Sequence, residues 1–294
     1  MLPPDVVRQL RRVRIRARRA VDSLASGKYR SIFRGTGLAF EEVREYQPGD
    51  DVRTIDWNVT ARMGHPFIKR HIEEREQTVF LLLDLSGSQQ TGTGPRSKRE
   101  ALAELAAVLA LGAVRDHDRV GLMLFTDRIE VCLRPSKSNR HALRLVRDIL
   151  FHQPRESGTS LRTALDFLAR IQRRRAVVFL FSDFIDTGYE RALRGIARRH
   201  DCIAVRVSDP LEHELPRAGL VQFADPETKT SVLVDTNSQL VRNTFAQQAR
   251  ERTIALRRLI QGAGAELLDV RADGSHLDSL ARFLRLRNER RYRH

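Results

Sequence analysis

The chain has 294 residues, of which 41% are hydrophobic and 30% charged, a composition typical of a soluble globular protein with a sizeable core. No apolar run reaches the roughly 18 residues of a membrane helix, and the first residues lack a signal-peptide pattern, so we expect a cytoplasmic protein. Cys132 and Cys202 each lie alone in strand-like sequence, which predicts reduced thiols rather than a disulfide framework.

The net charge of +15 is concentrated near the start of the chain, because residues 1–35 hold nine Arg and one Lys against two Asp, a net of +8. Apolar residues recur there at helical spacing, at Leu10, Val13, Ala17, Val21 and Leu24. We therefore predict a basic amphipathic helix within residues 1–29. Its arginines, within residues 8–19, either bind an anionic partner, such as nucleic acid or an anionic membrane surface, or only form a solvent-exposed face of the helix.

Residues 30–75 are rich in turn signals and predict a small β-containing module. Short strands are expected at Phe40–Tyr46 and Pro66–Glu73, with a turn at "QPGDD" and a short helix at Ile55–Arg62 between them.

Asp50, Asp51 and Asp56 fall within this segment. They could form a second acidic site, but carboxylates in such a segment more often form turns and pair with cations. We expect turn formation and pairing with Arg53 or Arg62.

From Thr78 onward the pattern alternates between strands and helices. Strands are predicted at Thr78–Leu83, Arg119–Thr126, Ile129–Leu133, Ala176–Ser182, Cys202–Val207 and Ala265–Val270, with a hairpin of Leu220–Ala224 and Ser231–Val234. Helices are predicted at Ser97–Val114, Asn139–Leu150, Ser160–Ile171, Tyr189–Arg199, Leu240–Gln261 and Leu277–Leu286. Continuous apolar strands alternating with helices predict an α/β fold with a doubly wound, mostly parallel sheet over residues 76–294.

Three polar loops are expected at the carboxyl ends of these strands, where ligands gather in open α/β sheets. They are "DLSGS" from Asp84, "ESGTSL" at Glu156–Leu161 and "SDFID" at Ser182–Asp186. Their carboxylate and hydroxyl oxygens, without His or Cys, favour Mg²⁺ or Mn²⁺ over Zn²⁺. The candidate metal-site residues are Asp84, Ser86, Ser88, Thr159 and Asp183.

Other readings of the first loop fit less well. A phosphate-binding P-loop needs a Gly-Lys-Ser/Thr sequence that "GSQQTGTG" lacks, and the Gly-x-Ser-x-Gly of serine hydrolases is absent. A phosphoryl-accepting aspartate of the haloacid dehalogenase type usually has a second Asp where this chain has Ser86. The structural alternative is that Asp84 caps a helix and the serines line a turn.

Asp84-Leu85-Ser86-Gly87-Ser88 resembles the Asp-x-Ser-x-Ser metal-ion-dependent adhesion motif of von Willebrand factor type A domains. Thr159 and Asp183 stand where the other two metal-site residues of that family belong, and the resemblance covers about residues 75–290. The upstream stretch "YQPGDDVRTIDW" resembles the bacterial domain-of-unknown-function family 58 (DUF58), whose members carry a type A domain behind such a segment.

The resemblance implies a non-enzymatic, Mg²⁺-dependent protein–protein interaction module. A partner would offer Glu or Asp to the metal, and a MoxR-type AAA+ ATPase is the implied partner. Asp84, Ser86 and Ser88 would bind the ion directly or through one water, Thr159 would join in a partner-bound state, and Asp183 would act through water. The alternatives are anionic-surface or nucleic-acid binding through residues 8–19 and, less favoured, a metal-dependent phosphohydrolase.

Overall fold

The computed structural model describes residues 4–26, 42–48, 50–70, 76–90, 92–93, 97–155, 158–224, 230–272 and 274–291. The chain divides into two compact units, one at Phe33–Gln77 and one that combines the N-terminal helix with the chain from Thr78 onward. Parts of the predicted strands, residues 40–41 and 71–73, lie outside the described residues, as do Glu156 and Ser157 of the second polar loop.

The larger unit is built on a six-stranded sheet of order β10-β7-β6-β3-β4-β5. Its strands are β3 (Thr78–Asp84), β4 (Arg119–Phe125), β5 (Ile129–Ser136), β6 (Val177–Phe181), β7 (Asp201–Ser208) and β10 (Glu266–Arg271). All neighbours are parallel except β5, which pairs antiparallel with β4 at one edge. The predicted α/β fold with a mostly parallel sheet is confirmed.

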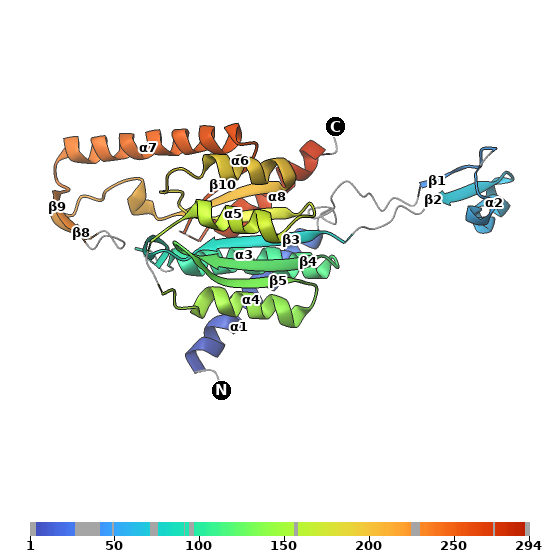
Figure 1. Ribbon diagram of the computed structural model, residues 1–294, viewed down its shortest axis with the longest axis horizontal. Helices are drawn as coiled ribbons and strands as arrows, with labels where there is room; N and C mark the ends of the chain where they lie inside the picture. Colours follow the sequence, from blue (N-terminus) through green and yellow to red (C-terminus); the bar gives the residue numbers. More distant parts are fainter. Residues whose placement is uncertain are drawn as a thin grey trace. The chain divides into compact units, whose positions relative to one another are not determined.

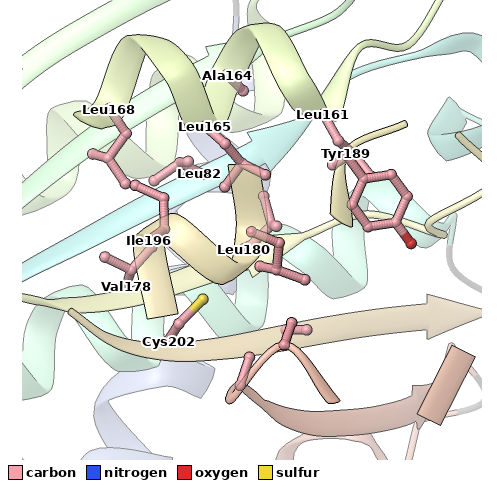
Figure 2. Close-up of a cluster of buried hydrophobic side chains, with 14 of the residues drawn as sticks. Leu82, Leu161, Ala164, Leu165, Leu168, Val178, Leu180, Tyr189, Ile196 and Cys202 are labelled. Atoms are coloured by element: carbon pink, nitrogen blue, oxygen red, sulfur yellow. The ribbon is translucent and has the colours of Figure 1, made fainter. Parts of the chain in front are cut away.

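Helices cover both faces of this sheet. They are α3 (Lys98–Arg115), α4 (Asn139–Phe151), α5 (Leu161–Ile171), α6 (Glu190–Arg199), α7 (Gln239–Gly262) and α8 (His276–Arg291). Figure 1 shows α5, α6 and α7 on one face and α3 and α4 on the other. On the first face, side chains such as Leu82, Leu165 and Ile196 interlock in the core cluster of Figure 2. Because both faces are covered, the central strands are buried and mostly apolar, as in Val79–Leu83.

Strand β3 is the point at which the chain changes direction across the sheet. The chain passes from β3 to its neighbour β4 on one side, and later enters β6 on the other side. Such a switch point opens a crevice at the carboxyl ends of the strands, where ligands bind in open α/β sheets. Asp84 is the last residue of β3 and therefore lies at the carboxyl edge of the sheet, at this switch point.

The basic N-terminal helix is α1 (Pro4–Ser26), and it packs against α3. Val13 and Ala17 on its apolar stripe are buried. On its polar flank, Arg16 Nη1 lies 2.7 Å from Glu104 Oε1. The apolar stripe predicted for this helix is therefore used within the chain itself.

The smaller unit contains β1 (Glu42–Glu45), η1 (Val52–Thr54), α2 (Trp57–Met63) and β2 (Phe67–Arg70), with β1 and β2 antiparallel. Its acidic residues organise the turns, as expected. Asp51 accepts a hydrogen bond at the start of η1, and Asp56 accepts bonds from two backbone N–H groups at the start of α2. Asp50 pairs with Arg44 at 2.7 Å, a partner that the sequence interpretation did not include.

The remaining elements are η2 (Gly87–Gln90), η3 (Pro210–Glu212) and an antiparallel hairpin of β8 (Leu220–Ala224) and β9 (Ser231–Asp235). The hairpin matches its predicted position. Among the described residues, no helix combines the length and the apolar character needed to span a membrane.

Candidate functional site

Asp84 is fully buried at the carboxyl end of β3. Its Oδ1 accepts a hydrogen bond from the Ser86 backbone N–H at 2.9 Å, and its Oδ2 accepts one from Ser182 Oγ at 2.7 Å. The bond to Ser86 turns the chain directly after the strand, which is a common role for Asp. Asp84 is therefore fixed by the loops that follow two neighbouring strands.

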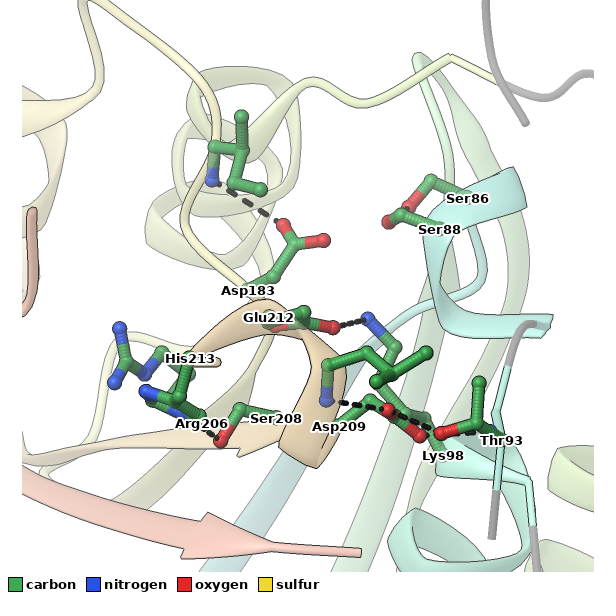
Figure 3. A network of polar contacts seen from close by, with 12 residues as sticks. Ser86, Ser88, Thr93, Lys98, Asp183, Arg206, Ser208, Asp209, Glu212 and His213 are labelled. Atoms are coloured by element: carbon green, nitrogen blue, oxygen red, sulfur yellow. Dashed lines mark hydrogen bonds and ion pairs between the residues drawn. The ribbon is translucent and has the colours of Figure 1, made fainter. Parts of the chain in front are cut away.

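Ser86 and Ser88 place two hydroxyls together beside this carboxylate. Their Oγ atoms lie 3.1 Å apart, at the start of the 3-10 turn Gly87–Gln90. Figure 3 shows both hydroxyls turned toward the side on which Asp183 lies. The structure therefore brings three of the predicted residues, Asp84, Ser86 and Ser88, together at the carboxyl end of β3.

Asp183 follows β6 and is 7% exposed. Its Oδ1 accepts a bond from the Ile185 backbone N–H at 3.2 Å, but its Oδ2 is buried without a hydrogen-bond partner among the described residues. The next residue, Phe184, has a φ of 61°, which is uncommon for a residue other than glycine. Such strained conformations are concentrated at functional sites, and the Phe184 N–H donates to Ser182 Oγ at 3.0 Å.

The charges of Asp84 and Asp183 are not compensated by the groups around them. Burial, and after it the negative charge of Asp183, raise the pKa of Asp84 to about 7, although the hydrogen bonds from Ser86 and Ser182 act in the opposite direction. A buried carboxylate with a second carboxylate nearby is stabilised in its charged form by a bound cation. The described residues contain no group of three or more His, Cys, Asp or Glu suited to a metal, so hydroxyls and water would supply the remaining oxygens, as Mg²⁺ prefers.

Thr159 belongs to the second polar loop, and its neighbours anchor that loop at the same end of the sheet. The Ser160 N–H donates to the Thr126 carbonyl, directly after β4, at 2.9 Å. The Leu161 N–H, at the start of α5, donates to Asp186 Oδ2 at 2.8 Å. The loop of Thr159 thus connects the carboxyl end of β4 with the loop that carries Asp183.

The described residues of the stretch "QQTGTG" after Ser88 are held by burial and hydrogen bonds. Gln89 is 1% exposed. Thr93 donates to Asp209 twice, from its N–H at 2.8 Å and from Oγ1 at 2.6 Å. In addition, the buried Lys98 lies 2.5 Å from Glu212 (Figure 3). These contacts fasten the first loop to the segment after β7.

Ser182 and Asp209 are the residues that sequence reasoning missed at this edge. Ser182, the first residue of "SDFID", is not among the predicted metal-site residues, although its hydroxyl contacts Asp84. The sequence does contain a signal for Ser182 and for Asp209, because each is a polar residue directly after a buried parallel strand.

Comparisons with known proteins agree with the sequence resemblance at the level of the family. The model of the family described as "Protein of unknown function DUF58" matches residues 42–255. Uncharacterized protein Rv1480 of Mycobacterium tuberculosis is 32% identical over 284 residues, which cover 96% of this chain and 89% of that protein. Uncharacterized protein Mb1516 of Mycobacterium bovis matches to the same extent. Among solved structures, conserved hypothetical protein BatB from Bacteroides thetaiotaomicron aligns with a TM-score of 0.45 and 17% identity, covering 70% of this chain and 96% of that chain. With most of its length matched at this identity, the chain belongs to the DUF58 family.

Proposed function

We propose that this protein is a Mg²⁺-dependent protein–protein interaction module of the von Willebrand factor type A kind, and not an enzyme. Asp84, Ser86, Ser88, Thr159 and Asp183 would hold Mg²⁺ or Mn²⁺ directly or through water. The observation that carries the proposal is the buried Asp183 Oδ2, which lies at the carboxyl edge of the sheet and has no hydrogen-bond partner among the described residues. A buried polar atom without a partner costs free energy, and a bound cation or its water would remove that cost.

The chemistry of the oxygen set favours binding over hydrolysis. A bound Mg²⁺ takes six oxygens and keeps several waters, so one coordination position can accept an oxygen from another molecule. A metal-dependent phosphohydrolase would need a general base and a catalytic acid besides the metal ligands. Among the described residues, no third His, Cys, Asp or Glu joins Asp84 and Asp183 in such a group. We therefore rank hydrolysis below binding.

The proposed ligand is an acidic side chain of a protein partner, and a MoxR-type AAA+ ATPase is the partner that the family resemblance implies. Ile185, two residues after Asp183, is 79% exposed. A partner that covers this exposed apolar side chain would add buried contact area and exclude water from the ionic contact.

Calorimetric titration of the full chain with Mg²⁺ and Mn²⁺ tests the metal site. We expect binding by the wild type and none by Asp84→Ala, with circular dichroism showing that the variant is folded. Equal binding by a folded Asp84→Ala variant would show that the site is wrongly assigned. A pull-down from a bacterial lysate with and without chelator then tests whether an AAA+ ATPase is retained only when the metal is present.

The basic helix supports a second candidate, which is binding to nucleic acid or an anionic membrane surface. Packing of α1 against α3 leaves Arg11, Arg12, Arg18 and Arg19 exposed. Replacing these four by Gln should weaken binding to double-stranded DNA and reduce its salt dependence, because fewer counterions are released. An unchanged salt slope would remove this candidate without affecting the metal site.

A further inference from the structure

An open pocket of about 390 Å³ lies between helix α7 and strand β10, on the side of the sheet reached by the carboxyl end of β7. Ser208 and His213 line it from the end of β7 and the η3 turn, Arg250 and Ile254 line it from α7, and Arg271 lines it from β10. The volume is in the range of pockets that hold small molecules, roughly 300–1,000 Å³. No residue of the candidate metal site lines it.

The acidic residue in the lining, Asp269, is already neutralised. Arg206 donates to it twice, from Nε to Oδ1 at 2.9 Å and from Nη2 to Oδ2 at 2.7 Å. The same guanidinium donates to Thr253 Oγ1 at 3.1 Å. Arg206 is 8% exposed, so this two-bonded pair forms a fixed and electrically balanced part of the pocket wall.

The charge that remains in the pocket is positive. Arg250 and Arg271 are both exposed, and neither forms an ion pair with a described residue. The pKa of His213 agrees with a positive environment. Burial lowers this pKa most, and the charges of Arg206 and Arg271 lower it further. Asp269 and Glu212 act in the opposite direction.

His213 and Ser208 add oriented polar groups. Ser208 Oγ donates to the Val270 carbonyl at 3.3 Å, so its lone pair is available to the His213 Nε2–H, which lies 2.8 Å away. Figure 3 shows His213, Arg206 and Ser208 grouped together on this side of the sheet. Ile254, with 50% of its surface exposed, supplies an apolar wall.

We propose that this pocket binds a small organic phosphomonoester, with the phosphate between Arg250 and Arg271 and the organic part against Ile254. A phosphomonoester carries about −1.5 to −2 charges at pH 7. It therefore balances the charge of two guanidinium groups better than a ligand with a single carboxylate would. Guanidinium groups also suit phosphate because they donate two parallel hydrogen bonds. The proposal is independent of the metal site.

Calorimetry of the full chain in Tris–chloride buffer without metal tests it, with phenyl phosphate as the probe. We expect binding that weakens about tenfold in each of Arg250→Gln and Arg271→Gln, the loss typical of one charge-assisted contact. Arg258→Gln is the matched control, since Arg258 is an exposed arginine of the same helix outside the pocket lining. It should bind the probe like the wild type.

Two further probes test the parts of the proposed ligand. Benzoate, which has one carboxylate, should bind more weakly than phenyl phosphate, and inorganic phosphate should bind more weakly because it cannot contact Ile254. Absence of phenyl phosphate binding by the wild type at millimolar concentration would overturn the proposal. An equal loss in Arg258→Gln would also overturn it, because binding would then follow overall charge rather than the pocket.

Discussion

Ser182 Oγ donates a hydrogen bond to Asp84 Oδ2 at 2.7 Å, although the two residues are 98 positions apart in the chain. The same hydroxyl accepts a bond from the Phe184 N–H at 3.0 Å. Ser182 therefore orients the carboxylate at the end of β3 and, at the same time, holds the turn that places Asp183. Residues that orient metal ligands in this way commonly affect metal affinity almost as much as the ligands do.

Ser182→Ala should weaken Mg²⁺ and Mn²⁺ binding by about tenfold or more, because Asp84 loses the donor that fixes its second oxygen. Calorimetric titration of both metals measures the change. Ser231→Ala, the same substitution at an exposed position of β9, is the control and should bind like the wild type. Wild-type affinity in a folded Ser182→Ala variant would show that this hydroxyl does not position the site.

The metal-free protein should lose stability as the pH rises through the range in which Asp84 titrates. The pKa of Asp84 is about 7 in the folded chain against 3.8 for an ordinary Asp, so between these values the folded state holds a proton that the unfolded state has lost. The free energy of unfolding therefore falls as the pH rises from 4 to 7. Asp84→Asn removes this dependence and should be more stable than the wild type at pH 8, by roughly 4 kcal/mol if the whole shift is realised.

Urea unfolding at several pH values, without metal, measures this difference. Asp166→Asn, at an exposed position of α5, is the control and should follow the wild-type pH dependence. Mg²⁺ at pH 8 should stabilise the wild type and not Asp84→Asn, because a ligand that binds only the folded state raises its stability. If the free energies of unfolding of the wild type and of Asp84→Asn changed with pH in parallel, this would contradict the raised pKa of Asp84.

The sheet could be predicted because its strands are buried on both faces. Runs such as Val79–Leu83 are apolar at every position, and the helices between them show helical periodicity. Boundaries were less predictable: β5 extends to Ser136 beyond the predicted Leu133, passing through Pro135. Proline is tolerated there because β5 is an edge strand and its free side needs no N–H donor.

The contacts that organise the candidate site could not be predicted, because they join distant parts of the chain through single side chains. The bonds between Thr93 and Asp209 span 116 positions and have no periodic signature. The positive φ of Phe184 could not be predicted from the sequence either, because "SDFID" contains no glycine or other residue that favours positive φ at that position. Motif similarity predicted a set of candidate oxygen donors, whereas tertiary packing determines how each side chain is held.

The two cysteines should differ sharply in reactivity. Burial, and after it the charge of Asp201, raise the pKa of the Cys202 thiol to about 12, whereas Cys132 is exposed on the edge strand β5. Since the thiolate is the reacting form, a disulfide reagent at pH 8 should label the native chain at Cys132 alone. Labelling should reach both cysteines in denaturant, and Cys132→Ser should remain unlabelled until it unfolds. Rapid labelling of native Cys132→Ser would show that Cys202 is accessible.

Glu104 should be the residue on which docking of the basic helix depends most. It is buried in α3 and receives contacts from two other helices, with Arg16 Nη1 2.7 Å from Oε1 and His276 Nε2 2.9 Å from Oε2. Glu104→Gln keeps the shape but removes the charge. Because Glu104 is buried whereas the Arg16 side chain is 36% exposed, we expect a loss of roughly 1–2 kcal/mol, less than for a fully buried ion pair. Urea unfolding should show that loss.

The same variant should expose α1, so trypsin should cleave after its arginines faster in Glu104→Gln than in the wild type. Glu251→Gln, on the exposed face of α7, is the control, because the Glu251 carboxylate accepts a hydrogen bond from Gln247 of the same helix and lies far from α1 in the sequence. A stable Glu104→Gln variant with wild-type cleavage rates would mean that Val13 and Ala17 hold the helix without help from the ion pair. In that case the exposed arginines would be presented on α1 by apolar packing alone, and anion binding through them would be insensitive to Glu104.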